Sequence, residues 1–170
     1  MIKIHFIVLS LVTFNPATYG VSATAQLQID GKTLSFADAQ DRSFCRWNSS
    51  FSPKSFGIEI AGEQGDLYFH LESFEHDLSS EANVSFDFHR DDPSDFSYAT
   101  IDDWSDSTRY ETFMYEDSAN CRLDLQLSET RQDLEGTFHC INLQKMTEEF
   151  KIGQGNLSAD GHFHCPYSVD

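Results

Sequence analysis

The stretches Cys121-Arg-Leu-Asp-Leu-Gln-Leu127 and Leu134-Glu-Gly-Thr-Phe-His-Cys140 decide the fold. Both alternate apolar and polar residues, a period of two that is typical of a β-strand buried on one face. A polar segment around Thr130 separates them, which predicts an antiparallel hairpin. With Cys121 opposite Cys140, the other opposed residues are Leu123 with Phe138, Leu125 with Gly136 and Leu127 with Leu134. All of them share one apolar face, and a slip of one residue would turn that face toward water.

The chain has four cysteines, Cys45, Cys121, Cys140 and Cys165. An even number in an exported domain predicts two disulfides. Opposed strand residues have Cα atoms about 4.5 to 5.5 Å apart, which suits a disulfide between Cys121 and Cys140. Elimination then pairs Cys45 with Cys165. Zinc is the competing use of four cysteines, but the chain has no Cys-x-x-Cys pair, so we favour disulfides.

Similar alternating runs recur along the rest of the chain, separated by turn residues. They cover residues 27–34 with an Asp30-Gly31 turn, 56–60, 67–71, 84–88, 110–115, 150–152 and 161–165. This spacing predicts an all-β fold, an antiparallel β-sandwich, with a β-barrel as the alternative. No linker rich in Pro or Gly divides residues 26–170, so we predict a single disulfide-stabilised domain.

Residues 1–25 have the pattern of a secretory signal peptide. Lys3 supplies the positive charge, residues 4–14 are apolar, and Ala23-Thr24-Ala25 matches an A-x-A cleavage site. The apolar run is shorter than the roughly 20 residues that span a bilayer, and no later segment approaches that length. We therefore expect a mature chain of residues 26–170 in the periplasm, on the cell surface or outside the cell, without a transmembrane anchor.

Charge excludes some partners. The chain carries 28 Asp and Glu residues against 11 Lys and Arg, a formal net charge of -17, which disfavours nucleic acid and anionic lipid. Residues 63–117 hold 16 of the acids and only two arginines. Within them we predict an acidic loop at 89–109, where clustered carboxylates could bind calcium. The simpler interpretation is a solvated surface, because the EF-hand spacing is absent.

The sequence Gly136-Thr-Phe-His-Cys140 recurs as Gly161-His-Phe-His-Cys165. Alternation directs Phe and Cys inward and His139, His162 and His164 outward. Two histidines separated by two strand residues lie about 6.6 Å apart and can reach one ion, so we consider a weak divalent-metal site. The simpler interpretation is two core strands of similar design with exposed histidines at their polar positions.

Two tryptophans are candidates for stacking on a ligand. Trp104 lies in the predicted acidic loop and Trp47 follows Cys45, although packing on the core is the commoner role of such a ring. The sequons at Asn48, Asn83 and Asn156 matter only where the secretory pathway glycosylates asparagine.

The order of an Ile29-Asp-Gly-Lys32 hairpin, an early Cys45 and a late hairpin ending in Gly136-Thr-Phe-His-Cys140 resembles small exported bacterial β-sandwich proteins and lipoprotein antigens. The resemblance covers the two ends of the mature chain and leaves the acidic middle unmatched. No cysteine lies near the predicted cleavage site, which departs from the lipoprotein members. The resemblance implies location and fold more than activity.

The expected function is a binding or surface-interaction module with an unknown ligand. The sequence lacks the motifs of serine hydrolases, zincins and nucleotide-binding proteins. A weak divalent-metal-binding protein is the alternative, followed by a hydrolase of unrecognised type. No cofactor other than a divalent metal is expected.

Overall fold

The computed structural model describes residues 22–38, 42–50, 54–72, 76, 78, 80–89, 97–112, 120–130, 132–146 and 156–169. These residues form eleven strands: β1 Thr24–Ile29, β2 Lys32–Ala37, β3 Phe44–Asn48, β4 Ser55–Ala61, β5 Gly65–Glu72, β6 Asn83–His89, β7 Tyr98–Asp103, β8 Thr108–Glu111, β9 Asn120–Leu127, β10 Asp133–Met146 and β11 Leu157–Val169. The prediction of an all-β fold is confirmed. No helix long and apolar enough to cross a membrane occurs in the described ranges.

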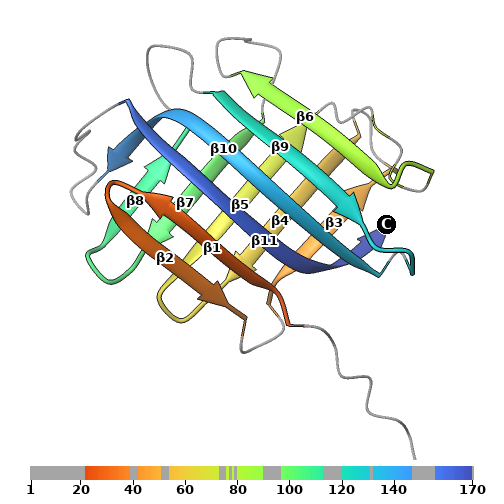
Figure 1. Ribbon diagram of the computed structural model, residues 1–170, viewed down its shortest axis with the longest axis horizontal. Coiled ribbons are helices and arrows are strands. Elements are labelled where there is room, and N and C mark those ends of the chain that lie inside the picture. Colours follow the sequence, from red (N-terminus) through yellow and green to blue (C-terminus); the bar gives the residue numbers. More distant parts are fainter. Residues whose placement is uncertain are drawn as a thin grey trace, which may run out of the picture.

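Hydrogen bonds join all the strands into one sheet that folds into two layers (Figure 1). The front layer has the order β2-β1-β11-β10-β9-β6, and the rear layer has the order β3-β4-β5-β7-β8. β10 and β11 are long, with 14 and 13 residues, and their ends pair with β8 and β3 of the rear layer. The two stacked layers agree with the predicted sandwich.

One strand pair departs from the predicted antiparallel arrangement. The end of β11, Tyr167 to Val169, runs parallel to β3. This pairing arises because β11 pairs with β10 of the front layer as far as Pro166 and then continues along the rear layer. The sheet is therefore mixed, with a single parallel pair among the pairings of the described strands.

The predicted hairpin register is confirmed residue by residue. β9 and β10 place Cys121 opposite Cys140, and the three apolar pairs that follow are those expected from the sequence. Both predicted disulfides are present, Cys121 with Cys140 and Cys45 with Cys165. The Asp30-Gly31 turn also forms as predicted, and both of its residues have positive φ, as a two-residue hairpin turn of type I′ requires.

The repeated Gly-x-Phe motif explains how β10 and β11 pack together. Gly136 lies opposite Phe163, and Phe138 lies opposite Gly161. A Cβ on Gly136 would lie 2.3 Å from the Phe163 ring, and one on Gly161 would lie 2.5 Å from the Phe138 ring. Each glycine thus makes room for the buried ring of the other strand, and both rings pack near Phe69 of the rear layer. The repeat has a structural origin.

The predicted loop at 89–109 is wrong over its second half. Residues 98–103 form β7, which continues through a turn at 104–107 into β8. The sequence did not predict this strand because one of its three inward residues, Ala99, Ile101 and Asp103, is a carboxylate, which interrupts the apolar alternation. Residues 90–96 lie outside the described ranges.

β1 begins before the predicted start of the mature chain. Thr24 and Ala25 pair with both β2 and β11, and Ala23 is buried. The Ala23 carbonyl also accepts a hydrogen bond of 3.0 Å from the Asp38 N–H. Cleavage after Ala25 would remove these contacts, whereas cleavage before Ala23 would keep β1 whole.

An ionic contact fastens the β1–β2 hairpin to the β7–β8 turn. Lys32 bridges Asp103, at 3.0 Å, and Asp106. Burial raises the pKa of Asp103, but hydrogen bonds from Ser105 and Lys32 outweigh burial and lower it. The hydrogen bond from Lys32 is the main cause of the lowered pKa of Asp106.

Lys32→Met is expected to lower the free energy of unfolding at neutral pH by about 1 to 2 kcal/mol, because Asp103 is buried while Lys32 is partly exposed. Carboxyls with lowered pKa stabilise the fold above their ordinary value of about 3.9 and lose this effect as the pH falls through their folded values. Urea unfolding from pH 7 to pH 3 should therefore show the two proteins converging in acid. A difference between the two proteins that persists unchanged in acid would contradict this contact.

Candidate functional site

The outer face of the front layer presents polar side chains in three parallel rows that cross five strands. The strand registers place one residue of β6, β9, β10, β11 and β1 in each row. The first row is Asn83, Gln126, Glu135, His164 and Thr24; the second is Ser85, Asp124, Thr137, His162 and Gln26; the third is Asp87, Arg122, His139, Asp160 and Gln28. Each strand alternates, so the residues between the rows point into the core.

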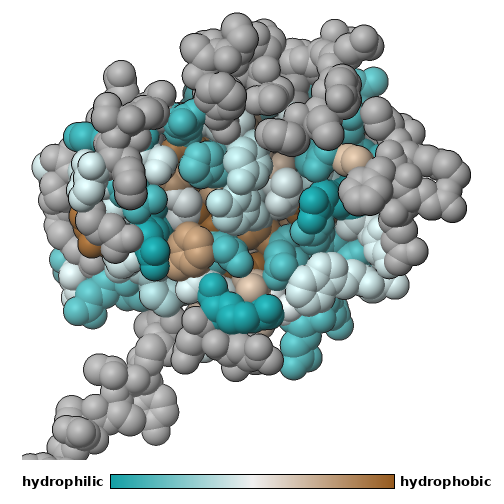
Figure 2. Space-filling model, turned by 180° about the vertical axis from the view of Figure 1, so that it is seen from behind, coloured by the Kyte–Doolittle hydropathy of each residue, from teal (hydrophilic) through white to brown (hydrophobic). Residues whose placement is uncertain are grey.

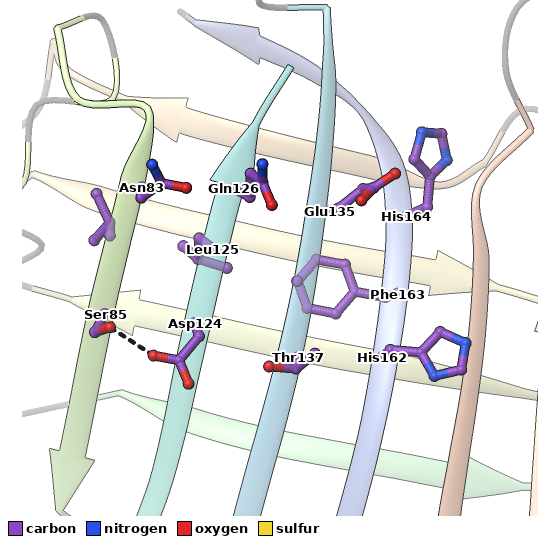
Figure 3. A pocket seen from close by; sticks show the side chains of 12 residues that line it. Asn83, Ser85, Asp124, Leu125, Gln126, Glu135, Thr137, His162, Phe163 and His164 are labelled. Atoms are coloured by element: carbon purple, nitrogen blue, oxygen red, sulfur yellow. Dashed lines mark hydrogen bonds between the residues drawn. The ribbon is translucent and has the colours of Figure 1, made fainter. Parts of the chain in front are cut away.

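A groove of about 530 Å³ lies between the first and second rows. It extends over β6, β9, β10 and β11, and Figure 3 shows the two rows of side chains on either side of it. Its floor is formed by Val84, Leu125, Gly136 and Phe163, the inward row between them.

Polar groups outside the groove are largely used within the protein. In the third row Arg122 pairs with Asp87 at 3.4 Å, and His139 Nδ1 lies 2.6 Å from Asp160. Toward β2, the Gln28 amide donates to Thr33 at 2.6 Å. These pairs leave little hydrogen-bonding capacity in this part of the face.

Several polar side chains of the groove, unlike those of the third row, are not bonded to other side chains. Asp124 accepts hydrogen bonds from Ser85 and Arg122, which lower its pKa. Among the described residues, Gln126, Glu135, Thr137 and His162 have no side-chain hydrogen bond. The carboxylate of Glu135 extends toward β11 (Figure 3). The groove therefore contains an amide, a carboxylate and a hydroxyl with unused hydrogen-bonding capacity.

The three histidines considered as a metal site, His139, His162 and His164, lie on the same outer face of the sheet, as alternation required. Their strands, β10 and β11, are neighbours. They do not converge. His139 is bonded to Asp160, while His162 and His164 point from β11 toward the side of β1 (Figure 3). Within the described ranges, no group of three or more His, Cys, Asp or Glu residues is placed to hold one metal ion.

The two tryptophans have different surroundings. Trp47 is 4% exposed in the core, with the Lys54 ammonium 5.5 Å from its ring centroid, so its ring has no open face for stacking. Trp104 is 48% exposed in the turn between β7 and β8, and its backbone N–H donates to the Gln64 carbonyl. Neither belongs to the groove. Sequence reasoning missed most groove residues because single polar residues on alternating strands carry no motif.

The outer face of the rear layer contains acidic groups that are partly desolvated. Burial raises the pKa of Glu111, of Asp66 and of Glu59, and neighbouring carboxylates add to the rise. Burial also raises the pKa of Tyr68 to about 12. Figure 2 shows this face, where hydrophobic residues are visible between paler and hydrophilic ones. Acids with raised folded pKa stabilise the protein in acid and lose this effect as the pH rises through that value.

Two of the three sequons are solvent-exposed, those at Asn83 in the groove and at Asn156 before β11. Asn48 is partly buried, and its amide donates to Ser55 at 3.4 Å. Asn83 is among the residues that line the groove.

The two disulfides indicate an oxidising, non-cytoplasmic environment. Comparisons of the chain with family models, with curated proteins and with solved structures find no match.

Proposed function

We propose that this protein is an exported binding module that holds a polar ligand in the groove of the front layer. The unused hydrogen-bonding groups of Gln126, Glu135 and Thr137 carry the proposal, since the neighbouring row satisfies its own polar groups. The groove has the size of a small-molecule site and lies on rigid strands. The leader-like residues 1–25 and the disulfides support an exported location.

The test compares two double variants of identical chemistry. Gln126→Ala with Thr137→Ala removes two groove groups, and Gln28→Ala with Thr33→Ala removes the same residue types from the same face outside the groove. Glycan and peptide arrays identify the tightest ligand, which calorimetry then titrates into both proteins. The groove variant is expected to bind about 10-fold more weakly, because each hydrogen bond contributes about 0.5 to 1.5 kcal/mol, while the control stays unchanged.

An array without a ligand would contradict the proposal. So would a ligand that both variants bind as tightly as the wild type does.

A further inference from the structure

The geometry points to an extended basic peptide as the occupant of the groove. This inference rests on the proposed function, because it names the ligand class of the same site. It is argued from the shape of the groove, its charge and its hydrogen-bonding groups.

The shape suits a narrow linear ligand. Neighbouring strands lie about 4.7 to 4.9 Å apart, so the groove is roughly 14 to 15 Å long from β6 to β11. The two flanking rows are two positions apart along each strand, which places their Cα atoms about 6.6 Å apart. An extended peptide advances about 3.3 Å per residue, so four or five residues cover this length. A ligand of this shape lies across the strands, between the two rows.

The charge of the groove favours a cation. Asp124 and Glu135 line it, and its lining contains no lysine or arginine. The nearest arginine, Arg122, lies in the third row and is shared between Asp87 and Asp124. Glu135 has no ion-pair partner among the described residues. Lysine and arginine side chains complement this pattern, and the net charge of -17 attracts such a peptide over longer distances.

The remaining lining groups suit a peptide backbone better than a sugar. Asn83 and Gln126 can each donate and accept, and so can the Thr137 hydroxyl, which matches the alternating N–H and C=O groups of a peptide. Sugars are commonly held against an aromatic face, but Phe163, the single aromatic residue of the lining, belongs to the inward row and is 2% exposed. The lining therefore favours a peptide.

The experiment measures the binding of three capped hexapeptides by fluorescence anisotropy: Lys-Thr-Lys-Thr-Lys-Thr, the same peptide with Gln for Lys, and the same peptide with Glu for Lys. A neutral hexasaccharide serves as a fourth probe. The variants are Glu135→Gln and Asp124→Asn, and Glu129→Gln is the control because it removes one exposed charge from the β9–β10 turn, outside the groove.

The lysine peptide is expected to bind most tightly and to weaken as salt rises. Each groove variant should reduce its affinity about 2- to 5-fold, as for solvent-accessible ion pairs, while the control stays within 2-fold of the wild type. Equal weakening by Glu129→Gln would show attraction to net charge alone and would overturn the inference.

The probes also separate this inference from the proposed function. If the glutamine peptide or the hexasaccharide binds at least as tightly as the lysine peptide, and Gln126→Ala with Thr137→Ala abolishes that binding, the groove is a site but its ligand is not basic. If none of the four probes depends on the groove residues, this inference fails, and the proposed function is decided separately by the array ligand and its two double variants.

Discussion

Replacing Cys45 and Cys165 with alanine is expected to lower the free energy of unfolding by about 4 to 5 kcal/mol. The two cysteines are separated by 120 residues, so their disulfide restricts nearly the whole domain in the unfolded state. It also fastens β3 to β11 where the chain passes from the front layer to the rear. Urea denaturation with linear extrapolation measures the effect.

The second disulfide provides the comparison. Cys121 and Cys140 are separated by 19 residues, so the corresponding alanine variant should lose less, about 3 kcal/mol in the same chain-entropy model. If this variant loses as much free energy of unfolding as the Cys45 and Cys165 variant, or more, then the Cys45–Cys165 bond is not the more stabilising of the two. Unfolding of the wild type in reductant should reproduce the effect of removing both bonds.

The substitution Gly161→Ala is expected to destabilise the protein by about 2 to 3 kcal/mol through overpacking. The new Cβ would lie 2.5 Å from the Phe138 ring and 2.7 Å from the Cβ of Leu27, and both side chains are buried. Phe138 has little freedom to move, because its ring packs against Phe69 with centroids 5.0 Å apart. Thermal unfolding followed by near-ultraviolet circular dichroism would report both the stability and the packing of the rings.

Gly57→Ala is the matched control. It is also a glycine inside a strand, but its added Cβ would meet only the Phe44 ring at 3.5 Å, an ordinary van der Waals contact. Alanine is preferred to glycine within a strand by about 0.5 to 1 kcal/mol, so this variant should be as stable as the wild type or slightly more stable. Similar destabilisation in both variants would show that the loss at Gly161 is not steric.

Features that depend on residues close in sequence could be predicted. The hairpin of β9 and β10 could be predicted because two alternating runs flank a short turn. Only one register of these runs buries all the apolar residues on one face. That register located one disulfide directly and the other by elimination. The Asp30-Gly31 turn was readable because its backbone requirement selects those residue types.

Apart from the Cys45–Cys165 disulfide, features that depend on distant segments were not predicted. The parallel pairing of Tyr167 to Val169 with β3 has no local signal. β7 was not predicted because Asp103, a carboxylate, occupies an inward position. Lys32, 71 residues earlier, donates a hydrogen bond to this buried carboxylate and so compensates for its burial. The groove arises only when β6, β9, β10 and β11 lie side by side, so the presence of Glu135 and Thr137 in its lining depends on strands far along the chain.

The position of β11 has a consequence for how the molecule reaches its folded state. The last strand lies between β1 and β10 in the front layer and then beside β3, so it touches elements from both ends of the chain. The β1–β2 hairpin has no complete docking surface until the final residues are available. Contacts of such large sequence separation slow folding. If the chain is exported as proposed, its front layer is completed only after the residues of β11 have crossed the membrane.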